Sequence, residues 1–133
     1  MKKIAILCIT ILLVSCNTTK NKTSSNNSLQ GDYLITALEV DDITTEKLTM
    51  RIDTTTNTVS GFSGCNTYRG MFSQTKDQVS IQDVASTKMY CPEKQKLERR
   101  VMNLFGRVVK TSTKEETIVL IDSNGEIIIT LRR

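Results

Sequence analysis

Short segments of alternating apolar and polar residues recur along most of the chain after residue 31 and predict β-strands. The clearest covers residues 48–52, where Leu48, Met50 and Ile52 alternate with Thr49 and Arg51, the period of a half-buried strand. Less regular segments predict further strands at residues 32–40, 59–62, 68–72, 79–81, 117–122 and 126–132. Seven or eight such segments, separated by short polar turns, indicate an antiparallel sheet.

The last two predicted strands flank Asn124-Gly125. An Asn-Gly pair between apolar alternations favours a two-residue hairpin, because both central positions of that turn need positive φ. Closure there would place two apolar residues of one strand opposite two of the other, on a face that we expect to lie in the core: Ile118 with Leu131, and Leu120 with Ile129.

Residues 92–105 have a helical period instead. Pro92 suits a first helical position, Gly106 follows the last apolar residue, and the apolar residues between them fall on one stripe. This amphipathic helix is expected to close one side or end of the sheet. The stripe consists of Leu97, Val101, Leu104 and Phe105, and a predicted solvated face carries Lys94, Lys96, Glu98, Arg99, Arg100 and Arg107.

The N-terminus has the pattern of an export signal. Lys2 and Lys3 precede an apolar run at residues 4–14, which is shorter than the roughly 20 residues that a transmembrane helix needs. The following Leu-Val-Ser-Cys, which ends at Cys16, resembles a bacterial lipobox, whose cysteine is lipidated and becomes the mature N-terminus. We therefore expect residues 1–15 to be a signal peptide and Cys16 to carry lipid. A cleaved secreted protein and an uncleaved anchor are the alternatives.

Residues 16–30 are almost wholly Asn, Thr, Ser and Lys, with Leu29 as their single apolar side chain after the cysteine. This composition predicts a flexible tether of roughly 20 Å, with an extra strand as the alternative, ahead of one folded domain at residues 31–133. The expected location is the cell envelope. In a Gram-negative cell we expect the periplasmic side of the outer membrane, because Asn17 is not the aspartate that retains some lipoproteins at the inner membrane.

Composition and charge argue against several functions. Loss of Lys2 and Lys3 would lower the formal charge from +4 to +2, too weak a balance to predict nucleic-acid binding. The chain has no histidine, the commonest general base. We therefore expect a monomeric, non-enzymatic domain with no catalytic residues, metal or cofactor. Two carboxylate pairs, Asp41-Asp42 and Glu115-Glu116, are expected in solvated loops.

The most distinctive part of the folded region is a pair of motifs. Gly-Cys-Asn is followed by an aromatic residue and a glycine, and Thr-x-Met-x-Cys stands just before the helix. The residues are Gly64, Cys65, Asn66, Tyr68 and Gly70, then Thr87, Met89 and Cys91.

This order resembles the META domain, also called the HslJ-like domain, over about residues 29–133. The resemblance implies a mainly β fold, an antiparallel barrel-like sheet related in shape to lipocalins, with one packed helix. It also implies a cell-envelope lipoprotein without established enzymatic activity, in a stress-related binding or structural role. The partners would be the membrane, through the lipid, and an unknown envelope protein or a small ligand. A small-ligand carrier that uses the barrel interior is the alternative function.

Read physically, the clustered glycines of the first motif predict a tight bend. Asn66, Tyr68 and Gly70 would then be architectural, or else line a binding surface. If residues 1–15 are removed and Cys16 is lipidated, Cys65 and Cys91 remain as an even pair in an oxidising compartment. A disulfide between the bend and the helix start is expected, with two buried thiols, or a redox or metal role, as the alternatives.

Overall fold

The computed structural model describes residues 28–133, and the predicted signal peptide and Cys16 lie outside them. The described chain is mainly β, as predicted. Its elements are β1 (Gly31–Leu38), β2 (Asp41–Asp42), a 3₁₀ turn η1 (Thr44–Glu46), β3 (Thr49–Asp53), β4 (Thr58–Phe62), β5 (Thr67–Thr75), β6 (Gln78–Ser86), α1 (Gln95–Phe105), β7 (Lys110–Lys114), β8 (Thr117–Ile121) and β9 (Ile127–Arg132).

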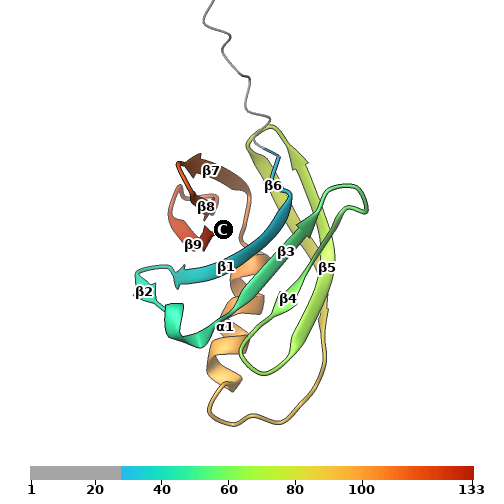
Figure 1. The fold of residues 1–133 in the computed structure, drawn as a ribbon, viewed down its shortest axis with the longest axis vertical. Coiled ribbons are helices and arrows are strands. Elements are labelled where there is room, and N and C mark those ends of the chain that lie inside the picture. The colour runs from blue at the N-terminus through green and yellow to red at the C-terminus, as the bar shows by residue number, and fades with distance from the viewer. Residues whose placement is uncertain (1–27) are drawn as a thin grey trace, which may run out of the picture.

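The strands form one antiparallel sheet that closes on itself, which confirms the barrel-like prediction. Neighbours follow chain order from β3 to β9, and β1 lies between β3 and β9 and so completes the ring. The weakest joint is between β6 and β7, which share a single bridge, Gln78 with Lys110. In Figure 1, α1 lies across the lower part of the ring, behind β1 and β3.

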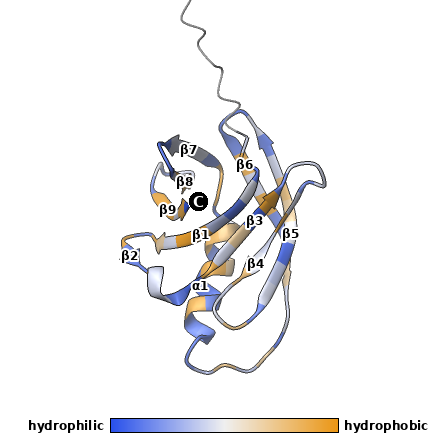
Figure 2. Cartoon of the chain, viewed as in Figure 1, coloured by the Kyte–Doolittle hydropathy of each residue, from blue (hydrophilic) through white to orange (hydrophobic). Residues whose placement is uncertain are grey.

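The interior of the ring is filled by large apolar side chains that alternate with outward polar residues, an alternation also visible along the strands in Figure 2. The helix adds its predicted stripe to this core: Val101, Leu104 and Phe105 are buried, and Leu97 is partly buried against them. Fully buried inward residues include Leu38, Leu48, Met50, Ile52, Phe72, Leu120 and Ile129.

The predicted start of the helix is wrong. Residues 92–94 form a turn, in which the Lys94 N–H donates to the Cys91 carbonyl at 3.0 Å, and α1 begins only at Gln95. The disulfide at Cys91 and the contacts of this turn fix the chain before the helix can start. Gly106 ends the helix as predicted, with a helical φ of −69°.

The last hairpin has the predicted strand register but a different loop. The Asp122 N–H donates to the Glu126 carbonyl, and Gly125 alone among the loop residues has positive φ. The loop is therefore three residues long, and a register shift after Leu120 restores the core pairing. The Asp122 carboxylate favours this loop because it accepts two backbone N–H groups within it. The confirmed pairs are Ile118 with Leu131 and Leu120 with Ile129.

The predicted tether ends earlier than expected, because the folded domain begins at Leu29. The Leu29 side chain is 2% exposed and belongs to the core, and its N–H donates to Gln74 Oε1 at 2.8 Å. The Gln30 side chain accepts the Thr54 N–H at 2.7 Å. A single apolar residue in a polar segment gives little sequence signal, but here it closes one end of the core.

Candidate functional site

The motif residues gather where the β4–β5 loop meets the start of α1. The loop turns at Gly64, whose φ of 109° is one that side-chain-bearing residues rarely adopt. The Ser63 N–H donates to the Asn66 carbonyl across the turn at 2.9 Å. Ser63 is fully buried and Asn66 is 5% exposed. The predicted tight bend is confirmed, and it directs the Asn66 side chain into the protein.

Asn66 fastens the segment that precedes the helix. Its Oδ1 accepts the Thr87 hydroxyl and the Met89 N–H, both at 2.7 Å. Its Nδ2 donates to the Met89 carbonyl at 3.4 Å. The Asn66 amide therefore provides the hydrogen-bond partners that the backbone of this loop would otherwise find in a strand. This role is architectural.

Glu98 on α1 completes the cluster and was not recognised from the sequence. Its Oε1 accepts the Ser63 hydroxyl and the Asn66 N–H, both at 2.7 Å, and its Oε2 accepts Asn66 Nδ2 at 2.8 Å. Partial burial acts to raise the pKa of Glu98, but the hydrogen bonds from Ser63, Asn66 and the Cys65 backbone outweigh it and lower the pKa. The one signal for it in the sequence was that Glu98 is the only acidic residue within α1.

A disulfide joins Cys65 and Cys91, with their Cα atoms 6.1 Å apart. It lies beside the Asn66 bonds, so the same two segments are held by a covalent and a hydrogen-bonded connection. This pairing confirms the expected disulfide and not the alternative of two buried free thiols. Among the described residues, no group of three or more His, Cys, Asp or Glu side chains is arranged to hold a metal ion.

The other motif residues pack the bend against the sheet. The Tyr68 ring lies 4.9 Å from that of Phe105 on α1, and its hydroxyl donates to the Thr49 carbonyl at 2.9 Å. Burial raises the pKa of the Tyr68 phenol. Gly70 has no room for a side chain, since a Cβ there would lie 2.8 Å from Val84. The structure thus gives Tyr68 and Gly70 the architectural role.

Met89 differs from the rest of the motif. Its backbone is held by Asn66, but its side chain is 66% exposed, and the neighbouring Tyr90 is 86% exposed. These two residues rim a surface hollow of about 270 Å³, whose lining includes Asn66, Gln95 and Glu98. Among the described residues, every buried side-chain nitrogen or oxygen has a hydrogen-bond partner, so the polar cluster is satisfied without a ligand.

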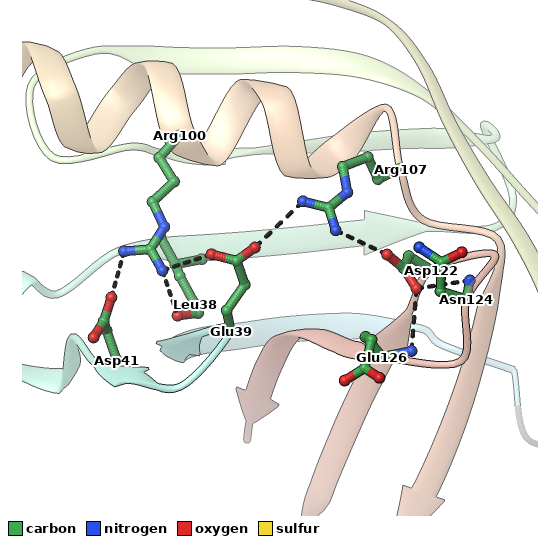
Figure 3. Close-up of polar contacts among 8 residues, drawn as sticks. All are labelled: Leu38, Glu39, Asp41, Arg100, Arg107, Asp122, Asn124 and Glu126. Atoms are coloured by element: carbon green, nitrogen blue, oxygen red, sulfur yellow. Dashed lines mark hydrogen bonds and ion pairs between the residues drawn. The ribbon is translucent and has the colours of Figure 1, made fainter.

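The helix face predicted to be solvated is partly an ion-pair surface (Figure 3). Arg100 donates to Asp41 at 2.6 Å, to Glu39 at 2.8 Å and to the Leu38 carbonyl at 2.9 Å. Arg107 donates to Asp122 at 2.8 Å and contacts Glu39 at 3.3 Å.

These contacts bind α1 to the β1–β2 turn and to the last hairpin, and Lys94 pairs in the same way with Glu46. The hydrogen bond from Arg107 lowers the pKa of Asp122.

The two carboxylate pairs lie in different surroundings. Asp41 and Asp42, expected in a loop, form the short strand β2, where Asp41 binds Arg100 and Asp42 accepts the Thr44 N–H at 2.8 Å. Glu115 and Glu116 lie in the exposed turn between β7 and β8, as predicted. In residues 28–133 no helix is long and apolar enough to cross a membrane.

A family model described as the META domain matches residues 16–133. No curated protein matches the sequence. The fold is similar to the NMR structure of a protein from Burkholderia xenovorans, with 23% identity, a TM-score of 0.62 and coverage of 78% of this chain and 81% of that one. A crystal structure of a DUF4847 family protein from Bacteroides vulgatus matches with 11% identity, a TM-score of 0.55 and coverage of 77% and 92%.

Proposed function

The chain belongs to the META domain family, and we propose that it is a lipid-anchored cell-envelope protein with a non-enzymatic binding or structural role. The observation that carries the non-enzymatic part is the use made of the motif. Asn66 and Glu98 bond to each other and to neighbouring protein groups. A catalytic carboxylate or amide needs hydrogen-bonding capacity toward a substrate. In this cluster the hydrogen bonds of Asn66 and Glu98 hold a loop of the protein itself.

The envelope location draws on two features of the chain. Cys16 follows a short apolar run in the position of a lipidated cysteine. The Cys65–Cys91 disulfide is typical of proteins exported to an oxidising compartment. Outer-membrane residence on the periplasmic side, in a Gram-negative cell, is part of the same proposal.

A small-ligand carrier remains the alternative, and the interior argues against it. Positions that would line a barrel cavity hold large side chains with at most 2% exposure, such as Met50, Phe72 and Leu120. Barrels of about eight strands are often filled by their own side chains in this way. We therefore place any binding on the outer surface.

Metabolic labelling with an alkyne fatty acid tests the anchor. The wild-type chain should be labelled and found in the membrane fraction, whereas Cys16→Ser should be unlabelled and released. Cys8→Ser, in the same leader, is the matched control and should behave like the wild type. Equal labelling of Cys16→Ser would refute the lipid anchor. Turnover of generic ester, peptide or glycoside substrates that disappears in Glu98→Gln would refute the non-enzymatic role.

A further inference from the structure

The loop between β8 and β9 contains the one Asn-Gly pair of the chain, Asn124-Gly125. In such a pair the backbone nitrogen after the asparagine can reach the side-chain carbonyl carbon, because glycine has no Cβ to obstruct the approach. The other asparagines of the folded domain precede larger residues: Asn57 and Asn66 precede threonine, and Asn103 precedes leucine. Asn124 is therefore the position at which the domain is best able to modify itself.

The Asn124 side chain is available for such a reaction. Asn124 is exposed, and within residues 28–133 its side-chain amide has no hydrogen-bond partner. Its contact with Asp122 in Figure 3 is made by the backbone N–H and not by the side chain. The side chain is therefore free to turn toward the Gly125 nitrogen.

The Gly125 nitrogen, by contrast, is held. Its N–H donates to the Asp122 carbonyl at 3.0 Å, and a nitrogen that keeps its proton in a hydrogen bond is a poor nucleophile. The Asp122 carboxylate braces the same loop, since its Oδ1 accepts the Asn124 N–H at 2.9 Å and the Glu126 N–H at 3.1 Å. The loop must therefore open locally before the Gly125 nitrogen can attack.

Arg107 holds the Asp122 carboxylate from outside the loop. An Arg107 guanidinium nitrogen donates to Asp122 Oδ2 at 2.8 Å, and the Asp122 side chain is only 3% exposed. The two carboxylate oxygens thus have different tasks (Figure 3): Oδ2 binds Arg107, just after α1, and Oδ1 binds the loop backbone. Loss of either contact should make the loop open more often.

We propose that Asn124 is a deamidation site and that the Arg107–Asp122 pair limits its rate by keeping the loop closed. In the open loop, the Gly125 nitrogen gives its proton to water and attacks Asn124 Cγ. The Cγ–Nδ2 bond breaks, the amide nitrogen leaves as ammonia with a proton from water, and a succinimide ring closes. Water then opens the ring at either carbonyl, which leaves aspartate or, where the main chain now runs through Cγ, isoaspartate. The reaction consumes water alone and needs no oxidant or cofactor.

The product would act back on the loop. A carboxylate at position 124 adds negative charge to a segment that already carries Asp122 and Glu126. Isoaspartate also lengthens the main chain between the two N–H groups that Asp122 Oδ1 binds. Since like charges in proximity repel, both changes favour the open loop and weaken the connection between the last hairpin and α1.

The test uses the chain from residue 16 with Cys16→Ser, incubated at mildly alkaline pH in water labelled with heavy oxygen. Peptide mapping by mass spectrometry follows the label at position 124, where it should enter faster in the urea-unfolded chain than in the folded parent. Arg107→Gln and Asp122→Ala should speed deamidation of the folded chain about tenfold, which corresponds to the loss of one hydrogen bond to a charged group. Asn124→Gln should abolish labelling at this position.

Two control variants separate the loop from the rest of the fold. Arg100→Gln is matched to Arg107→Gln, because Arg100 pairs with Glu39 and Asp41 and not with the loop. Leu104→Ala weakens the core, where Leu104 is 2% exposed, so it would speed deamidation only if global unfolding set the rate. Both controls should deamidate like the parent.

Three results would overturn the proposal: no label at position 124 in the unfolded chain, equal rates in the parent and Arg107→Gln, or an equal acceleration in either control. Hydrogen exchange of the Gly125 N–H provides a second measurement that does not depend on the chemical step. Exchange should be faster in Arg107→Gln than in the parent and unchanged in Arg100→Gln. Unchanged exchange in Arg107→Gln would show that this arginine does not keep the loop closed, and it would refute the proposal even if Asp122→Ala failed to fold.

Discussion

Removal of the disulfide should destabilise the domain by a calculable amount. Cys65 and Cys91 are 26 positions apart, and the bridge limits the freedom of the unfolded chain between them. The chain-entropy relation gives a cost of about 3.5 kcal/mol at 25 °C for a loop of this length. We therefore expect Cys65→Ala/Cys91→Ala to lose about that much free energy of unfolding.

The native state should change little in this variant. The Asn66 bonds to Thr87 and Met89 still hold the two segments together, so the loss acts mainly on the unfolded chain. For a folded domain of roughly 100 residues, the entropy of unfolding is about 0.2 kcal/mol per degree. The melting temperature should accordingly fall by roughly 15 °C.

Urea unfolding and thermal melting, each followed by circular dichroism with and without reductant, provide the assay. Reduced wild type should match the double variant, and reductant should not affect the double variant further. A loss below about 1 kcal/mol would show that the loop is held as well without the bridge, and the entropic reasoning would fail. A reductant effect on the double variant would mean that it acts elsewhere in the protein.

Three further predictions concern packing and charge. Leu104→Ala should cost about 2–5 kcal/mol in urea unfolding because Leu104 is 2% exposed in the core, whereas the exposed neighbour Asn103→Ala should change stability by less than about 0.5 kcal/mol; similar values for both would refute the helix face. Gly61→Ala should destabilise by roughly 2–4 kcal/mol, since a Cβ there would lie 2.0 Å from a backbone carbonyl oxygen, while Gly106→Ala, with its nearest atom at 3.7 Å, should be tolerated. Asp122→Asn should lower stability at neutral pH, and the difference from wild type should shrink as the pH falls below about 4, because a carboxyl with a lowered pKa stabilises the fold above its unfolded pKa and loses that effect when it is protonated. A difference that stays constant to pH 2 would contradict this.

The periodicity of apolar residues was sufficient to predict much of the fold. The alternation at residues 48–52 and the helical stripe at Val101 and Leu104 predict burial directly, since each depends on neighbours along the chain. β7 was missed because its sequence, Lys-Thr-Ser-Thr-Lys, contains no apolar residue. It is a strand because β8 pairs with it along its whole length, and Thr111 is its single buried position. Only the tertiary context makes that segment extended.

The role of Glu98 could not be read from the chain for a similar reason. Among five basic residues on the same polar side of the helix, a glutamate has the pattern of a solvated position. Its bonds to Asn66 span 32 positions and exist only once the disulfide and the bend have placed the loop beside α1. The two sequence motifs predicted the bend and its disulfide to the helix start, but they did not include the carboxylate on which the hydrogen bonds of the cluster converge.

Net charge could not show which arginines are paired with acids. A mature chain with a formal charge of +2 gave no reason to expect a concentrated basic surface. The fold sorts the charges unevenly, however. Arg100 on α1 and Arg107 just after it pair with acids from the β1–β2 turn and the last hairpin. Arg69 and Arg132, by contrast, have no acid opposite them in strand register. A balance summed along the sequence counts both groups equally, although only the first is paired with acids.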